Sequence, residues 1–344
     1  MNLFNKHSNF YILCLLIVFS FIFFNKPGDP SLAKTSLGIF FFSFVAFKSH
    51  LYFAKKNGWG QSVRKEGLKT HLQKEGTPTA AGWVFFVFLS LVIYIYAPTL
   101  FLNEKNTIIC ILSTFVMFCL GALDDYQKIK GKKEGLLARY RLAGQFFVGS
   151  LLGYYLLPWD LYTNIIVGFL LFGTAVNGIN FTDGSDGLLA AVILATPIGI
   201  LTLYQTAPLL GFSFEKILNN TNYLFLFLAL LMLAWIPFNK YPAKLFMGET
   251  GSYSLGALIG FIAIYSVSLN PSITFIILAI PAFQIGTVVL QVFSYKKFGK
   301  RIFLMAPFHH HLEKKGWTEN KIAYSAFFAQ LTLTVSALMR VNPS

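Results

Sequence analysis

Apolar segments long enough to cross a lipid bilayer recur along the whole chain, and they constrain its fold more than any other feature. Hydrophobic residues make up 55% of the 344 positions and charged residues only 12%. A soluble domain carries about 25% charged residues, whereas a membrane-spanning helix needs roughly 17–25 apolar residues in a row. The sequence therefore predicts an all-α, polytopic integral membrane protein.

Ten segments have the length and hydropathy of transmembrane helices. They lie near 32–53, 83–101, 107–123, 142–157, 161–177, 187–205, 222–238, 250–269, 272–293 and 323–341. A shorter apolar run at 10–24 could span, re-enter or lie in the interface. Because this run lacks a clear small-residue cleavage site, we do not expect a signal peptide that is removed. We expect residues 1–344 to form one helical-bundle domain.

Basic residues mark one side of the predicted bundle. The loops 54–82, 124–141, 238–249 and 294–322 hold 21 of the 28 Lys and Arg residues, and an even number of predicted helices separates each loop from the next. By the positive-inside rule, this shared face is cytoplasmic. The loop 178–186 lies on the same face by parity. We therefore expect a lipid bilayer, and no nucleic acid, as a partner of this basic protein.

Five acidic residues lie beside apolar segments at this boundary: Asp124, Asp125, Asp183, Asp186 and Glu249. Ionised carboxylates at a membrane boundary are costly, so we expect them to hold a cation or to perform chemistry. The adjacent pair Asp124-Asp125 favours a shared proton or a hard metal ion such as Mg²⁺. A solvated pair at a helix end is the structural alternative.

Three polar segments on the same face each allow two interpretations. Segment 177–188 is rich in Asn, Asp and Gly, a composition that suits ligand binding but also a tight turn. Residues 246–252 open an apolar helix, where backbone amides could meet a phosphate and Glu249 could simply favour the helix dipole. Residues 309–311 are three histidines. Consecutive residues do not share a helical face, so a substrate contact or a surface cluster is favoured over a zinc site.

Together and in this order, these segments resemble the polyprenyl-phosphate N-acetylhexosamine-1-phosphate transferases. The resemblance runs from about residue 55 to residue 341. Asp124-Asp125 matches an aspartate pair of that family, and segment 177–188 resembles its Asn/Asp/Gly-rich motif. Segment 306–317, with its three histidines, is similar to the segment that distinguishes the members using a muramoyl-pentapeptide substrate. The chain has Glu249 where the family usually has Asp, and Ala80-Ala81-Gly82 where it usually has Met-Gly-Gly.

The resemblance implies a Mg²⁺-dependent phosphoglycosyl transferase of the bacterial cytoplasmic membrane, with its active site on the cytoplasmic face. Undecaprenyl phosphate would attack the sugar-linked phosphate of UDP-N-acetylmuramoyl-pentapeptide, release UMP and form the first lipid intermediate of peptidoglycan synthesis. A phosphate monoester is already mostly ionised at pH 7, which favours direct attack over an aspartate base or a phospho-enzyme. A homodimer is compatible with the resemblance.

The resemblance also implies roles for individual residues. Glu249 would be the leading Mg²⁺ ligand, with Asp124 or Asp125 beside it, and a longer side chain than Asp would change the metal geometry. The catalytic residues would be Asp124, Asp125, Asp183 and Lys128. Substrate would be bound by Lys74, Thr77, Lys132, Asn177, Asn180, Gly184, Asp186, Asn239, Phe246, Gln291, His309, His310 and His311, with Phe246 stacked on uracil.

Two other functions remain open on sequence alone. A sister transferase that uses UDP-N-acetylglucosamine would share the aspartate segments but should lack the histidine-rich segment. A transporter would place its carboxylates along a conduction path instead of at one boundary. No inverted repeat is apparent in the sequence, which disfavours the transporter.

Overall fold

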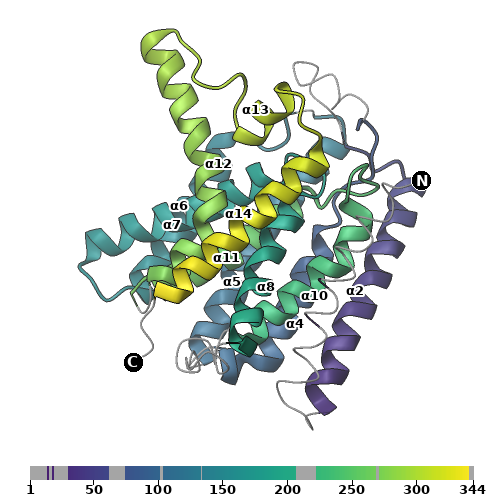
Figure 1. The fold of residues 1–344 in the computed structure, drawn as a ribbon, viewed down its shortest axis with the longest axis vertical. Helices are drawn as coiled ribbons and strands as arrows, with labels where there is room; N and C mark the ends of the chain where they lie inside the picture. Colours follow the sequence, from purple (N-terminus) through teal and green to yellow (C-terminus); the bar gives the residue numbers. More distant parts are fainter. Residues whose placement is uncertain are drawn as a thin grey trace.

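The computed structural model describes Cys14, Val18 and residues 30–61, 74–100, 104–132, 134–206, 222–268 and 271–340. Within these ranges the regular elements are all α-helices, and Gly60 and Pro78 form an isolated β-bridge. In chain order the helices are α2 (Pro30–Lys56), α4 (Gly82–Leu100), α5 (Glu104–Ile129), α6 (Ala138–Leu156), α7 (Leu161–Thr182), α8 (Leu188–Thr206), α10 (Asn222–Asn239), α11 (Gly248–Val267), α12 (Pro271–Phe298), α13 (Phe308–Lys314) and α14 (Glu319–Arg340) (Figure 1).

The helices agree with the predicted membrane architecture. Each of the ten predicted spans coincides with one helix, and α13 is a short additional helix in the last predicted loop. Six described helices, α2, α5, α7, α11, α12 and α14, are long and apolar enough to cross a membrane, while α4, α8 and α10 contain shorter apolar stretches. The all-α, multi-pass fold class is confirmed. Of the run at 10–24, only Cys14 and Val18 lie within the described residues, and the rest of that prediction lies outside them.

Several helices extend further at their polar ends than hydropathy predicts, among them three that carry candidate site residues. Helix α5 continues from the expected end at 123 to Ile129, α7 continues from 177 to Thr182, and α11 begins at Gly248. The Asp124-Asp125 pair therefore lies within the last turns of α5 and not after the helix. Hydropathy marks where the apolar environment ends, whereas the backbone hydrogen bonds of a helix continue beyond that point. Helical spacing then places Asp124 and Lys128 on one face of α5.

Helix α11 is the centre of the bundle, because it packs against α4, α5, α6, α7 and α12. Nearly all of its side chains are buried, as expected for a helix that is apolar on every side. Glycines let its neighbours approach closely, a common device in membrane helix packing. A Cβ atom added to Gly82 of α4 would lie 1.9 Å from the backbone nitrogen of Gly251, and one added to Gly256 would lie 2.6 Å from Cα of Val176.

Helix α12 extends beyond the rest of the bundle (Figure 1). Its 28 residues span roughly 42 Å at the rise of an α-helix. The aromatic side chains of Phe293, Tyr295 and Phe298 are each more than half exposed in this protruding part. Such exposure is expected in contact with lipid, where apolar side chains gain nothing by packing inward.

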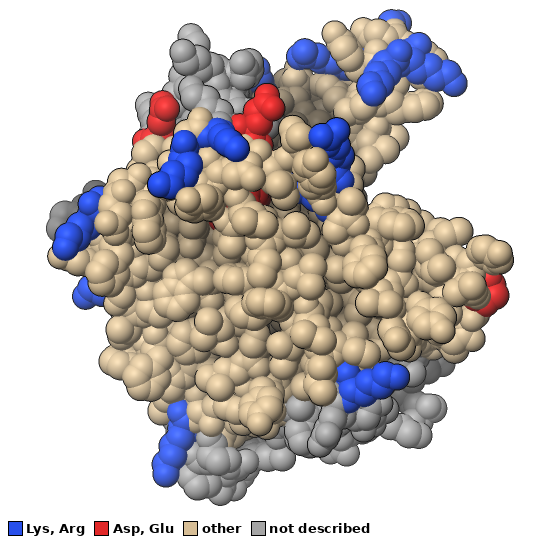
Figure 2. Space-filling model, turned by 180° about the vertical axis from the view of Figure 1, so that it is seen from behind, with Lys and Arg blue, Asp and Glu red and all other residues tan. Residues whose placement is uncertain are grey.

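The charges on the surface fit a membrane-embedded bundle. Figure 2 shows a broad middle belt with few charged side chains, while Lys and Arg lie at the upper end, on the protruding part of the molecule and beside it, with a few more at the left and lower edges. The belt matches the high cost of charge within the hydrocarbon core. Its upper border is the end at which α12 finishes in Figure 1.

The close contact between α4 and α11 generates a prediction about stability. Gly82→Ala should destabilise the bundle by about 1–3 kcal/mol or more, since the added methyl group meets backbone atoms that cannot move aside. Gly286→Ala is the matched control, because a Cβ atom there would meet nothing within 4 Å. Thermal unfolding in detergent should show a clear loss only for Gly82→Ala, and equal melting temperatures would contradict the close approach.

Candidate active site

The candidate site lies where loops and helix ends meet at one end of the bundle. The backbone nitrogen of Phe246 donates to the carbonyl oxygen of Pro78 at 2.8 Å, and that of Gly82 donates to Met247 at 2.9 Å. These bonds join the segment before α4 to the segment before α11. Side chains from α5, α13 and α14 and from the end of α7 reach the same region.

Asp125 holds the first turn of α11. Its Oδ1 atom accepts from the backbone nitrogen of Glu249 at 3.0 Å, and its Oδ2 atom accepts from the nitrogen and the hydroxyl of Thr250 at 2.9 and 2.5 Å. Gly248, with φ of +71°, lies so close that a Cβ atom would come within 2.3 Å of Oδ2. A carboxylate from α5 thus satisfies backbone donors that a helix N-terminus leaves unpaired.

Asp124, Lys128 and Glu249 form a cluster of ion pairs. The ammonium of Lys128 lies 2.7 Å from Oδ2 of the fully buried Asp124 and also donates to Oε1 of Glu249. The other oxygen of Asp124, Oδ1, accepts from the backbone nitrogen of Leu136 at 2.7 Å. The guanidinium of Arg141 approaches that oxygen to 4.0 Å. A second basic side chain therefore supports the charge of Asp124.

The three carboxylates Asp124, Asp125 and Glu249 suit a divalent cation. One oxygen atom from each lies within 4.8 Å of the others. Carboxylate oxygens are the ligands that Mg²⁺ prefers, and the ion usually takes one or two of them together with water and substrate phosphate. Since Asp125 already accepts three hydrogen bonds from α11, Asp124 and Glu249 are the more available ligands. The donor set therefore fits the ion that the sequence predicts, although it does not identify that ion.

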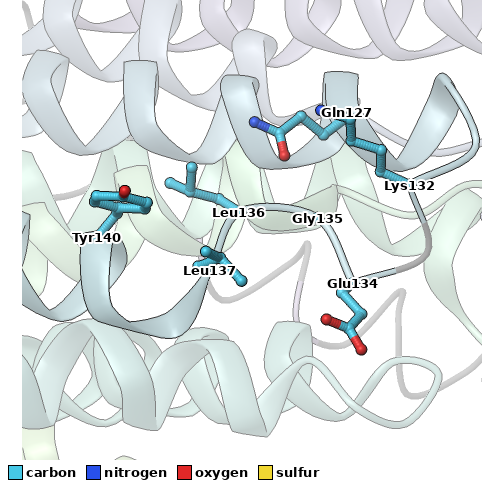
Figure 3. Close-up of a pocket in the computed structure, with 7 residues that line it drawn as sticks. All are labelled: Gln127, Lys132, Glu134, Gly135, Leu136, Leu137 and Tyr140. Atoms are coloured by element: carbon cyan, nitrogen blue, oxygen red, sulfur yellow. The ribbon is translucent and has the colours of Figure 1, made fainter.

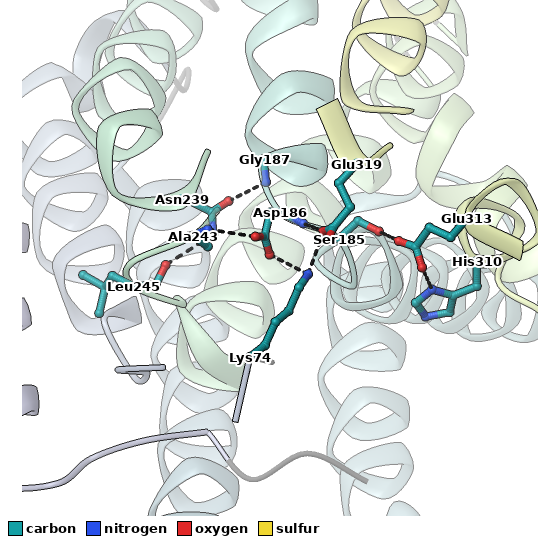
Figure 4. A network of polar contacts seen from close by, with 10 residues as sticks. All are labelled: Lys74, Ser185, Asp186, Gly187, Asn239, Ala243, Leu245, His310, Glu313 and Glu319. Atoms are coloured by element: carbon teal, nitrogen blue, oxygen red, sulfur yellow. Dashed lines mark hydrogen bonds and ion pairs between the residues drawn. The ribbon is translucent and has the colours of Figure 1, made fainter. Parts of the chain in front are cut away.

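Lys74 lies in a second polar network, which it forms with Asp186 and Glu319 (Figure 4). Its ammonium bridges Oδ1 of Asp186 and Oε2 of Glu319, each at 2.6 Å. The same Glu319 oxygen accepts from the backbone nitrogen of Asp186 at 2.6 Å, and Oδ2 of Asp186 accepts from the backbone nitrogen of Ala243 at 2.8 Å. Burial by itself would lower the pKa of Lys74, but the charges of Asp186 and Glu319 outweigh it and raise that pKa above its ordinary value.

Asn239 completes this network on the side of α10. Its side-chain oxygen accepts from the backbone nitrogen of Gly187 at 3.1 Å, and its amide nitrogen donates to the carbonyl of Leu245 at 3.3 Å (Figure 4). Asn239 therefore holds the polar turn before α8 against the segment that precedes α11. Asn239 was predicted to line the nucleotide site; in the structure it holds the backbone at Gly187 and Leu245 in place.

The three histidines of α13 have different surroundings. His309 is buried and packs against Gly184, where an added Cβ atom would lie 2.6 Å from Nε2. His310 contacts Oε2 of Glu313 through Nδ1 at 2.9 Å, and the other carboxylate oxygen of Glu313 accepts from the hydroxyl of Ser185 (Figure 4). His311 points elsewhere, because its Nδ1 atom accepts from the backbone nitrogen of Leu304 at 3.1 Å.

Other predicted substrate ligands make contacts within the protein. Asn177 pairs with the side chain of Gln145 at 2.6 Å, and Asn180 donates to the hydroxyl of Ser252 at 2.9 Å. Gln291 binds the chain after α12, since it accepts from the backbone nitrogen of Phe303 at 2.9 Å and donates to its carbonyl at 3.0 Å. Thr77 and Phe246 are partly exposed on neighbouring segments. Their binding roles stay predictions.

Lys132 lines an open pocket of about 450 Å³ beside the Asp124 cluster (Figure 3). The pocket lies over the connection from α5 to α6 and is also lined by Gln127, Glu134, Gly135, Leu136, Leu137 and Tyr140. Leu136 connects it to the carboxylates, because the backbone nitrogen of Leu136 donates to Asp124. The pocket thus brings a basic side chain and apolar side chains together next to the candidate catalytic pair.

Asp183 ends α7 at the edge of both clusters. Removal from bulk water raises the pKa of its carboxyl well above the ordinary value, and the charges of Glu249 and Asp186 act in the same direction, while Lys74 offsets part of the effect. A carboxyl with a raised pKa in a polar cleft is a frequent property of catalytic residues, but it also occurs in structural clusters.

Sequence reasoning missed Glu313, Glu319 and Ser185. Glu313 follows His310 by three residues, a spacing that allows a helical contact, and Glu319 begins α14. Both patterns occur routinely in helices without any ligand. Only the fold brings Glu319 to Lys74, which lies 245 positions earlier.

Comparisons with known proteins identify relatives of this chain. A family model described as Glycosyl transferase family 4 matches residues 107–267. Among similar curated proteins is a phospho-N-acetylmuramoyl-pentapeptide-transferase from Dictyoglomus thermophilum, 34% identical over 87% of this chain and 95% of that protein. Proteins of the same name from Caldanaerobacter subterraneus and Deinococcus radiodurans are each 33% identical, over 81% and 79% of this chain and 89% and 88% of their own lengths.

Without Lys74, the carboxylates of Asp186 and Glu319 should repel each other. Lys74→Met leaves Asp186 and Glu319 facing each other in a mostly buried site and should cost about 3–5 kcal/mol of stability. Adding Glu319→Gln should recover part of the loss, since it removes one of the opposed charges. Chemical unfolding in detergent would measure this, with the exposed Glu75→Gln as control. A double variant no better than Lys74→Met would contradict the proposed charge balance.

The pKa of Asp183 generates a prediction about pH. Because folding raises this pKa, ionisation weakens the folded state as pH rises from the ordinary value of about 4 towards the folded value. Asp183→Asn removes that ionisation. The melting temperature of Asp183→Asn relative to the wild type should therefore increase as the pH rises above the ordinary pKa of an aspartate, about 4. A difference that does not change with pH would show that Asp183 has an ordinary pKa.

Proposed function

The chain belongs to the phospho-N-acetylmuramoyl-pentapeptide transferases, and from this membership we propose the reaction that it catalyses. It transfers phospho-N-acetylmuramoyl-pentapeptide from the UDP-linked precursor to undecaprenyl phosphate and releases UMP. The chain spans most of the length of relatives that carry this name, so the activity of the whole protein is carried over and not that of a fragment.

The cluster of Asp124, Lys128 and Glu249 is the observation that most strongly supports this reaction. The step brings the lipid phosphate next to a sugar diphosphate, so several negative oxygens crowd together. Lysine side chains and a divalent cation are the usual means of stabilising such charge. The cluster offers a buried carboxylate, a partly exposed carboxylate and an ammonium within one site at the end of the bundle.

We infer that Asp124 and Glu249 are the main Mg²⁺ ligands, and that Asp125 contributes by positioning Glu249. When bound, the cation would offset negative charge on the phosphate oxygens. Glu249 supplies the same hard oxygen atoms as Asp, from a side chain one methylene longer. The hydrogen bonds of Asp125 to the first turn of α11 fix where that longer side chain begins.

The acceptor phosphate needs little activation from the protein. A phosphate monoester has its second pKa near 6 and is mostly a dianion at pH 7, so direct attack on the sugar-linked phosphate is favoured over a phospho-enzyme. The polyprenyl chain can stay in the bilayer while its phosphate reaches the polar end of the helices. Lys128 and Lys132 are the lysines that border this end of α5 and can neutralise phosphate oxygens.

The nucleotide would bind beside the second network. Phe246 would stack on uracil, and Gly184 and Asp186 would contact its edge, with His309 packed behind Gly184. The contacts of Lys74 and Glu319 hold Asp186 in a fixed orientation, which favours recognition by a preorganised site. His310 and Glu313 extend this polar surface away from α8, towards the sugar and peptide.

We propose that the site faces the cytoplasm of a bacterium across its inner membrane. The positive-inside rule supports this orientation, because the segments around the site hold most of the Lys and Arg residues. A water-soluble nucleotide donor would approach from that side, while the lipid acceptor stays in the membrane. The sister reaction with UDP-N-acetylglucosamine is not favoured by the names of the relatives, and the homodimer stays a prediction.

Release of UMP tests this function directly. Full-length protein in detergent should release UMP from UDP-N-acetylmuramoyl-pentapeptide when undecaprenyl phosphate and Mg²⁺ are present, and not from UDP-N-acetylglucosamine. Glu249→Ala should lower the rate by about 100-fold or more, because it removes a ligand for the charge-stabilising cation. The exposed Glu75→Ala should keep the wild-type rate. UMP from the N-acetylglucosamine donor would instead assign the chain to the sister reaction.

A further inference from the structure

The carboxylate oxygens that can hold a divalent cation are the same oxygens that Lys128 already contacts. Asp125 uses three of its about four acceptor positions on Glu249 and Thr250 of α11. Oδ1 of Asp124 is engaged by the backbone of Leu136. Oδ2 of Asp124 and Oε1 of Glu249 both lie against the Lys128 ammonium.

A cation at these two oxygens would therefore compete with Lys128. It would lie within a few ångströms of the ammonium, where positive charges repel each other strongly outside bulk water. Lys128 is on the last turn of α5, a quarter of its side chain is exposed, and its four-carbon stem can turn towards the aqueous end of the bundle. Helix α5 ends at Ile129, and Gly131 follows with a positive φ of +91°.

We propose that Lys128 is an internal competitor for the divalent cation, and that the displaced ammonium becomes a contact for substrate phosphate. The inference rests on the proposed function, since it requires a cation and a phosphate at this site. Lys128 then occupies the cation site before the metal binds, and it binds substrate phosphate once it is displaced. Its ammonium neutralises Asp124 and Glu249 until a stronger cation takes those oxygens.

This exchange couples the two ligands. Because the cation must displace Lys128, it binds more weakly than it would to the same carboxylates without the lysine. This loss of affinity is recovered when a substrate phosphate binds the displaced ammonium. Metal should therefore tighten phosphate binding, and phosphate should tighten metal binding by the same factor, because coupling between two binding sites is reciprocal. The nucleotide substrate would thus be held firmly only when the cation is also present.

The affinity for Mn²⁺ tests the competition without measuring activity. Mn²⁺ prefers the same oxygen ligands as Mg²⁺ and is visible by electron paramagnetic resonance. In full-length protein without nucleotide, Lys128→Met should bind Mn²⁺ at least fivefold more tightly than the wild type, since the competing charge is gone. Lys128→Arg should stay close to the wild type, because it keeps a cation beside the two carboxylates.

Two controls separate competition from a general effect of charge. Lys130→Met removes an exposed lysine of the same segment and should leave Mn²⁺ affinity within twofold of the wild type. Arg141→Met removes a positive charge 4.0 Å from Asp124 that does not bridge to Glu249, and it should have a much smaller effect than Lys128→Met. Equal effects of Arg141→Met and Lys128→Met would overturn the proposal, as would unchanged or weaker binding in Lys128→Met.

The coupling itself is measured with UMP as the phosphate probe. Mn²⁺ should tighten UMP binding to the wild type, and Lys128→Met should lose most of that enhancement. Glu249→Gln tests whether Mn²⁺ binds at the proposed site. It should abolish Mn²⁺ binding both in the wild type and in Lys128→Met. If neither the wild type nor Lys128→Met binds Mn²⁺, both the metal site and the competition are wrong. If both bind it equally, the metal site stands and the competition is wrong.

Discussion

The hydrogen bonds between Asp125 and the first turn of α11 are the interaction on which the rest of the site depends. Helix α11 is buried at the centre of the bundle, so the backbone donors of its first turn need partners from the protein. A carboxylate from α5 supplies those partners. The same bonds set where Glu249 begins, and they bring it to Lys128 and Asp124. One structural contact thereby positions three groups that can act on phosphate.

Charge balance explains why so many ionised groups persist at one end of an apolar bundle. Two lysines of the site are each shared by two carboxylates: Lys128 by Asp124 and Glu249, and Lys74 by Asp186 and Glu319. The carboxylates thus outnumber the lysines in each cluster, and Arg141 adds a further positive charge near Asp124. The paired arrangement lowers the cost of removing these charges from water, and it leaves two ammonium groups that substrate phosphates can attract.

In the proposed function, the Asp124 cluster would serve phosphate transfer and the Lys74 network would serve nucleotide binding. The first is built on α5 and α11, which are embedded in the bundle, and the second on loops between helices, with α13 and α14 beside them. Enzymes commonly hold their reacting groups on rigid elements and build their recognition surface from loops. The protruding part of α12 lies outside both regions and combines exposed aromatic side chains with Lys296 and Lys297.

The sequence alone was enough to predict the membrane-spanning helices and the polar segments that contain the candidate site residues. Both are local properties, because a helix in lipid must satisfy its own backbone and show its apolar length in the sequence. The boundaries of α5 and α7 were placed too early, since hydropathy does not report where backbone hydrogen bonds end. The resemblance to a family narrowed the chemistry, but it gave Asp124 and Asp125 similar roles.

Only the tertiary structure separated those roles. Asp125 binds the first turn of α11 and Asp124 binds Lys128, although the two aspartates are neighbours in the chain. The fold also brought in Glu319, which contacts Lys74 across 245 positions. Such contacts depend on how helices pack against α11, and no local pattern specifies that packing. The helices and the polar segments could thus be predicted from the sequence. Helix packing determines that Asp125 supports the structure and that Asp124 remains available to a cation.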